Sequence, residues 1–107
     1  MNGADAFLTL RLLRGAGVTI AATNHKEPLM IIGYAAGAYD LFHYGHLEIL
    51  RKAKENCDYL IAGVVHDDVL EVTKGRRPVI PIEERAAIVS HIDYVDEVHI
   101  ETTPDKL

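Results

Sequence analysis

Two histidines near the middle of the chain, His43 and His46, stand three residues apart with Gly45 between them. Apolar residues at helical spacing follow, so both imidazoles are expected on one side of the first turn of a helix. That turn offers unpaired backbone N–H groups and the positive end of the helix dipole. Gly45 would let an anion approach the backbone closely. The pattern predicts a binding site for phosphates.

The reaction that suits such a site is attack by a phosphate oxygen on the α-phosphorus of a nucleotide, with pyrophosphate leaving. Catalysis then consists of positioning and charge stabilisation, without a covalent enzyme intermediate. Imidazole N–H groups can donate to the phosphate oxygens, and Lys74 in a later loop would add a positive charge. A structural or metal-binding role for the two histidines is the weaker alternative, because no third metal ligand stands at motif spacing.

The elements around these residues alternate between strand and helix. Such alternation predicts an α/β, Rossmann-like fold with a parallel sheet and right-handed crossovers, and its exit loops meet at one edge. His66 and Asp67 follow the second strand at that edge. We weigh His66 evenly between a site contact and a bystander, and a helix N-cap is at least as good a role for Asp67. The predicted strands are 29–32, 59–65 and 97–101; the helices are 45–56, 67–72 and 82–92; loops span 33–45 and 73–81, and 102–107 opens a further helix.

The first 28 residues are harder to interpret. Residues 5–14 could form a short helix and residues 18–22 a strand, with a polar linker after them. We therefore divide the chain into an N-terminal extension of unknown role, residues 1–28, and a partial nucleotidyltransferase domain, residues 29–107.

Bulk properties exclude several classes of protein. The 107 residues suffice for one domain, and the net charge of -5 argues against nonspecific nucleic-acid binding. No apolar run is long enough to cross a membrane, and the N-terminus does not read as a signal peptide. The lone Cys57 fits a buried core thiol in a reducing compartment. A cytoplasmic location is expected.

The segment from Gly37 to His46 resembles the G-x-(F/Y)-D-x-x-H-x-G-H signature of cytidylyltransferases, which belong to the larger HxGH nucleotidyltransferase superfamily. The resemblance continues in register over residues 29–107, which makes it specific. The further matches are RKAK with CDYL at 51–60, Lys74-Gly75, Glu84-Arg85 and YVDEV at 94–98.

The resemblance implies Mg²⁺-dependent transfer of CMP from CTP to a small alcohol phosphate, such as glycerol 3-phosphate or ethanolamine phosphate, by a homodimer. It implies that His43 and His46 bind phosphate and stabilise the transition state, and that Lys74 contacts phosphate. Asp40 would lie near the acceptor and the Mg²⁺. Residues implied in nucleotide binding are Gly37, Ala38, Tyr39, Asp40, Gly45 and Arg85.

The family pattern continues with a G-x-D-W-like motif and an R-x-x-x-I-S-T-T-like motif, neither of which is present in this sequence. The resemblance therefore predicts a domain truncated at its C-terminus. Two alternatives to CTP-dependent transfer stay open. One is an ATP-dependent adenylyltransferase acting on a sugar phosphate, and the other is a noncatalytic nucleotide-binding or dimerisation fragment.

Overall fold

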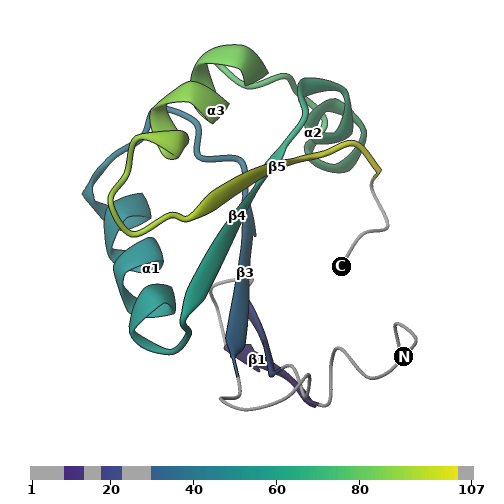
Figure 1. The fold of residues 1–107 in the computed structure, drawn as a ribbon. Helices are drawn as coiled ribbons and strands as arrows, with labels where there is room; N and C mark the ends of the chain where they lie inside the picture. Colours follow the sequence, from purple (N-terminus) through teal and green to yellow (C-terminus); the bar gives the residue numbers. More distant parts are fainter. Residues whose placement is uncertain (1–8, 14–17, 23–29, 104–107) are drawn as a thin grey trace.

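The computed structural model describes residues 9–13, 18–22 and 30–103, with side chains placed in the last of these ranges. Five strands form one sheet in the order β1-β2-β3-β4-β5, and helices lie beside it (Figure 1). The strands are β1 (Thr9–Leu13), β2 (Val18–Ala22), β3 (Ile31–Gly37), β4 (Tyr59–Val65) and β5 (Glu97–Glu101); the helices are α1 (Tyr44–Glu55), α2 (Asp67–Lys74) and α3 (Ile82–Ser90).

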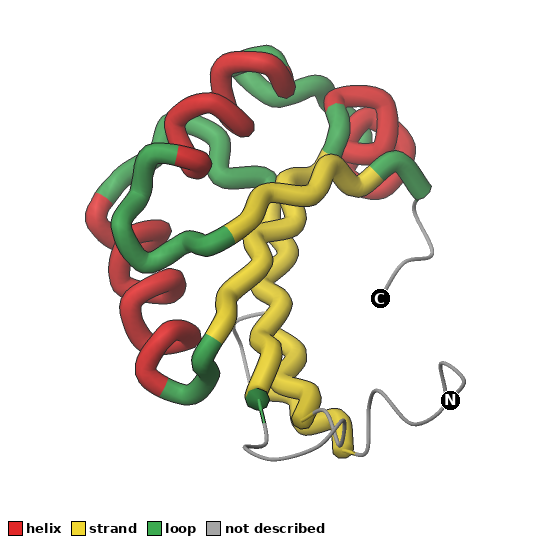
Figure 2. The backbone as a smooth tube through the Cα atoms, in the orientation of Figure 1, coloured by secondary structure: helices red, strands yellow, loops and turns green. Residues whose placement is uncertain are grey.

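The half of the sheet formed by β3, β4 and β5 is parallel, which confirms the predicted α/β class. The register pairs Ala36 with Gly63 and Gly63 with His99, so the three strands end near one another. Their carboxyl ends form one edge of the sheet, where the loop after β3 and the N-terminus of α2 lie (Figure 2). Ligands of parallel sheets bind at such edges.

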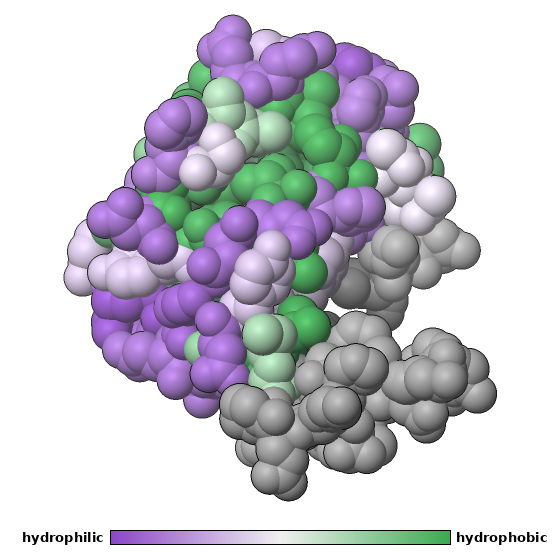
Figure 3. Space-filling view, viewed as in Figure 1, coloured by the Kyte–Doolittle hydropathy of each residue, from purple (hydrophilic) through white to green (hydrophobic). Residues whose placement is uncertain are grey.

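Helices α1 and α3 pack against the same face of the parallel strands. This placement follows from the strand order, because two right-handed crossovers that step in one direction leave their helices on one side. Hydrophilic side chains predominate on the outside of α1, whereas apolar side chains reach the surface between the helices (Figure 3). The core between the layers is apolar. Its completely buried members are Ala35, Leu50, Leu60, Ala62, Val64 and Val89. Within the described ranges no helix is long and apolar enough to cross a membrane.

The N-terminal segment departs from the prediction. Thr9–Leu13 forms a strand where a helix was expected, while the predicted strand over Val18–Ala22 is confirmed. The two pair antiparallel, and β2 continues antiparallel onto β3, so both belong to the same sheet as the rest. Cross-strand hydrogen bonds decide the conformation here, because five largely apolar residues fit a strand as well as a helix. The polar linker over 24–28 and the helix start at 104–107 lie outside the described residues.

Two element boundaries also differ from the prediction. Strand β3 continues to Gly37 instead of ending at residue 32, because its small residues allow close pairing with β4 along its whole length. Helix α2 continues to Lys74, and Gly75 ends it with φ 83°, a left-handed conformation that glycine adopts at little cost. The N–H of Gly75 donates to the carbonyl of Glu71. Both extensions shorten the loops that surround the site.

Candidate functional site

The loop between β3 and α1 is held in an uncommon backbone conformation. Tyr39 and Leu41 have φ of 54° and 51°, in the left-handed region that costs a non-glycine residue roughly 1–2 kcal/mol. Tyr39 is anchored by its buried ring, and its hydroxyl donates to the carbonyl of Ala35 at 2.9 Å. Burial raises the pKa of Tyr39. Its side chain therefore belongs to the core, and only its backbone lies along the predicted nucleotide site.

His43 and His46 stack on each other at the start of α1, with ring centroids 4.0 Å apart and planes 30° apart. The Nδ1 atom of His43 accepts the backbone N–H of Gly45 at 2.9 Å, and the Nδ1 atom of His46 accepts the backbone N–H of His43 at 3.2 Å. Together these bonds form a capping box. Because both Nδ1 atoms are acceptors, each neutral ring carries its proton on Nε2. Two Nε2–H donors are thus available at the helix N-terminus.

The environment of His46 favours this neutral form. Burial of the ring lowers the pKa of His46, and repulsion from His43 lowers it further, against a smaller opposing effect of Asp40. A proton added at Nδ1 would also break the capping bond to the backbone of His43. The geometry therefore keeps His46 as a neutral hydrogen-bond donor rather than an imidazolium.

The imidazole of His43 leaves no room for a side chain at Gly45. A Cβ atom at this position would lie 2.7 Å from Cε1 and 3.1 Å from Nδ1 of His43. A side chain would therefore push the imidazole out of its capping position. This contact is a reason for glycine beyond the close approach of an anion that the sequence suggested.

Asp40 joins the loop after β3 to the loop before α3. Its two carboxylate oxygens accept the backbone N–H groups of Val79 at 2.8 Å and Ile80 at 2.9 Å. Burial alone would raise the pKa of Asp40, but these two bonds and the nearby charge of Arg85 outweigh it and leave the pKa lowered. Asp40 is therefore ionised and fixed in place. Each oxygen keeps a further lone pair, but in the described part of the chain no three acidic, histidine or cysteine side chains cluster to hold a metal.

Arg85 lies behind the site, with its side chain fully buried. It donates to the carbonyls of Ala38 at 2.7 Å, Val65 at 2.8 Å and Ile80 at 2.7 Å, and it pairs with the carboxylate of Asp67. These acceptors are all protein groups: Ala38 and Ile80 lie in two different loops, Val65 ends β4 and Asp67 begins α2. The structure thus gives Arg85 and Asp67 a supporting position in which they fix the loops, without a contact surface for a nucleotide.

A cleft of about 570 Å³ lies between the two loops that Asp40 joins. Arg77 on its rim is already paired, with Asp68 at 3.1 Å and Glu71 at 2.7 Å. Over the described residues, Lys74 and Arg76 have no carboxylate within ion-pair distance, so their charges are available to an anion. We refer to this space as the basic cleft; its lining is Ala38, Asp40, Leu41, Leu70, Lys74, Arg76, Arg77, Pro78 and Val79.

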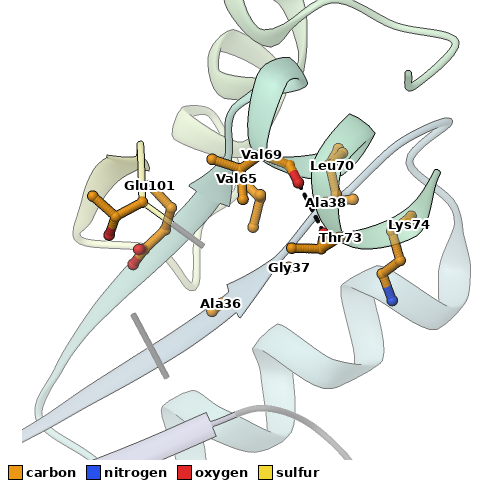
Figure 4. Close-up of a pocket in the computed structure, with 10 residues that line it drawn as sticks. Ala36, Gly37, Ala38, Val65, Val69, Leu70, Thr73, Lys74 and Glu101 are labelled. Carbon is orange, nitrogen blue, oxygen red and sulfur yellow. Dashed lines mark hydrogen bonds between the residues drawn. The ribbon is translucent and has the colours of Figure 1, made fainter. Parts of the chain in front are cut away.

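A second cavity of about 280 Å³ opens beside the basic cleft, between the strand ends and α2 (Figure 4). Gly37 and Ala38 line it, as does Glu101, which the sequence analysis did not single out. The position of Glu101 at the end of a parallel strand was the signal that could have identified it. His66 lines neither space: its Nδ1 accepts the N–H of Asp68 at 3.1 Å and so caps α2.

Comparisons with known proteins identify relatives of this chain. Residues 34–105 match the family model described as cytidylyltransferase-like. The FAD synthase of Thermococcus kodakarensis is 44% identical over 79 residues, which cover 74% of this chain and 51% of that protein. The ethanolamine-phosphate cytidylyltransferase of Arabidopsis thaliana is 46% identical over 68 residues, which cover 63% of this chain and 16% of that protein.

Among solved structures, the lipopolysaccharide core biosynthesis protein from Thermoplasma volcanium is similar, with a TM-score of 0.64 and 27% identity. The match covers 70% of this chain and 60% of that one. The chain thus spans about half the length of the FAD synthase that it matches.

Proposed function

Because this chain belongs to the cytidylyltransferase-like family, we propose that it acts in nucleotidyl transfer from a nucleoside triphosphate to a small phosphorylated alcohol. One bond forms, between an oxygen of the acceptor phosphate and the α-phosphorus, and one breaks, between the α-phosphorus and the bridging oxygen to the β-phosphate. Pyrophosphate leaves with the electrons of that bond.

The observation that carries the proposal is the stacked pair His43 and His46, which presents two Nε2–H donors at the N-terminus of α1. Charge grows on the nonbridging oxygens of the α-phosphate during the reaction. Donors fixed in advance stabilise that charge without the cost of reorganising. Lys74 and Arg76 in the basic cleft would neutralise the departing pyrophosphate.

Mg²⁺ belongs to the proposal as the companion of the triphosphate, whose negative charge it would neutralise. The ion commonly binds through one or two carboxylates together with substrate phosphates. Asp40, at the wall of the basic cleft, is the carboxylate placed to contribute a lone pair. The homodimer and the cytoplasmic location stay predictions.

Two nucleoside triphosphates, CTP and ATP, are candidates for the nucleotide donor. CTP with glycerol 3-phosphate or ethanolamine phosphate is supported by the family match and by the plant cytidylyltransferase. ATP is supported by the FAD synthases, because FAD is a flavin phosphate joined to AMP. In that second form the acceptor is a phosphate monoester with a large ring system, such as FMN, instead of the sugar phosphate suggested by the sequence.

Pyrophosphate release separates these forms. CTP and ATP are each incubated with Mg²⁺ and one of four acceptors: glycerol 3-phosphate, ethanolamine phosphate, FMN or a heptose phosphate. We expect release with one nucleotide and one acceptor class, and none from the His46→Ala variant. Nucleotide binding without release by any combination would favour the noncatalytic fragment, and absence of both binding and release would contradict the proposal.

A further inference from the structure

The cavity beside the basic cleft shares three of its lining residues with it. Ala38, Leu70 and Lys74 line both spaces, so the two lie side by side and are close enough for two parts of one molecule. In Figure 4 the side chain of Lys74 extends from the last turn of α2, at the opposite end of the cavity from Glu101. We call this space the strand-end cavity.

The lining of the strand-end cavity differs in chemistry from that of the basic cleft. Ala36 and Val65 line it together with Val69 of α2, and most of the surface is apolar. At the far end stands Glu101, with only 2% of its surface exposed. A buried carboxylate repels phosphate and attracts hydrogen-bond donors. The two spaces therefore suit different parts of a substrate.

The sheet beneath Glu101 is shaped to leave room for polar groups. A Cβ atom on Gly63 would lie 2.3 Å from the hydroxyl oxygen of Tyr34 and 3.0 Å from Oε2 of Glu101. Gly63 thus lets a hydroxyl and a carboxylate lie together against the strand. The Tyr34 hydroxyl is buried and has no hydrogen-bond partner within the described residues. A hydroxyl beside a carboxylate can pair with the edge of a group that carries both donors and acceptors.

We propose that the strand-end cavity receives the uncharged organic group of a phosphorylated substrate, and that Glu101 determines specificity by accepting its N–H or O–H donors. The proposal rests on the proposed function, because it places the phosphates of the same substrate in the basic cleft. The smaller volume, about 280 Å³, fits one ring system or a short polyol, whereas about 570 Å³ in the basic cleft accommodates several phosphates. Lys74 would bind where the two parts join.

The donor-bearing group can come from either substrate. It is the nucleoside if the triphosphate extends from the basic cleft into the strand-end cavity. It is the alcohol or ring of the acceptor if the phosphate monoester does so. Both carry N–H or O–H donors attached to phosphate, so the binding experiment must present them separately.

The test measures the affinity of the full chain for five probes by calorimetry: tripolyphosphate, CTP, ATP, glycerol 3-phosphate and FMN. Glu101→Gln keeps the shape of the side chain but removes its charge. We expect tripolyphosphate to bind this variant as it binds the wild type, because it occupies the basic cleft alone. At least one organic probe should bind roughly ten-fold more weakly, as expected when a hydrogen bond to a charged group is lost. Weaker binding of CTP or ATP would show that the nucleoside occupies the cavity. Weaker binding of glycerol 3-phosphate or FMN would show that the acceptor occupies it.

A second variant tests the cavity independently of the Glu101 charge, and its binding of tripolyphosphate reports whether the protein is folded. Ala36→Leu narrows the cavity without removing the carboxylate, and it should weaken the same organic probe while leaving tripolyphosphate unaffected. Wild-type affinity for every organic probe in both variants would overturn the proposal for the cavity alone. Failure of the wild type to bind tripolyphosphate and both nucleotides would overturn the proposed function as well.

Discussion

The carboxylate of Asp40 holds the backbone N–H of Ile80 at 2.9 Å, across 40 residues of sequence. With the matching bond to Val79 it fixes the two loops that enclose the basic cleft. The residue that the family signature marks as acidic therefore acts on the shape of the site. Substitution of Asp40 should therefore change both the free energy of unfolding and the affinity for phosphates.

Asp40→Asn should lower the free energy of unfolding by about 1–3 kcal/mol, because the amide replaces one charge-assisted acceptor by a donor that faces another N–H group. Binding of tripolyphosphate should weaken in parallel as the cleft loosens. Thermal unfolding and calorimetry measure the two effects. The matched control is Asp93→Asn, an exposed substitution of the same kind. Equal behaviour of the two variants would remove Asp40 from the architecture of the cleft.

His46→Ala should reduce kcat by about 10²- to 10³-fold, the usual cost of removing one fixed donor to a developing negative charge. Stability should fall by only about 1 kcal/mol, because a single capping bond is lost. Pyrophosphate release and denaturant unfolding provide the two values, with the exposed His91→Ala as the control. Unchanged turnover in His46→Ala would refute the assigned role.

Stability should depend on pH through His46. Its pKa is lowered in the folded protein from 6.5, so the unfolded chain binds more protons near and below that pH. The contribution of His46 is then fully present above pH 6.5 and is lost as the pH falls through the folded value. Melting temperatures measured from about pH 5 to about pH 8 should show this loss, and it should be smaller in His46→Gln. Identical pH profiles for the two proteins would argue against a neutral, capping His46.

Arg85→Lys should destabilise the fold by roughly 3–5 kcal/mol, since it leaves buried carbonyls and the Asp67 carboxylate short of donors. An ammonium cannot reproduce the planar fork that reaches two loops, the end of β4 and the start of α2. The control is Arg51→Lys, whose pairs with Glu48 and Glu55 lie on a helix surface and contribute little. Denaturant unfolding compares them, and a loss in Arg85→Lys as small as the control's would show that the buried guanidinium is dispensable.

The strands and helices of the parallel half followed from the sequence because their apolar periods are strong. Tyr59–Val65 is a continuous apolar run, and the apolar residues of α1 recur every three or four positions. The predicted helix over residues 5–14 was wrong, because the pairing of Thr9–Leu13 with β2 leaves no periodic pattern in the local sequence. The length of β3 was missed because small residues carry little periodic signal.

Within the site, the spacing of His43 and His46 predicted a shared face, and the structure stacks the two rings there. What the sequence could not supply were contacts between distant segments. The bonds of Asp40 to Val79 and Ile80 depend on how two loops meet. The burial of Arg85 and the cavity at Glu101 depend on packing around three strand ends. Local patterns contain no information about such encounters.

Asp67 has one oxygen for each of two arginines: Oδ1 pairs with the buried Arg85, and Oδ2 lies 3.8 Å from Arg77 at the surface. Because the oxygens are separate, the outer arginine can leave without unpairing the inner one. The ion pair at the surface is thus separate from the buried one. Substitutions at position 77 can accumulate during evolution, and the loop can be redesigned for other anions, while the scaffold stays intact.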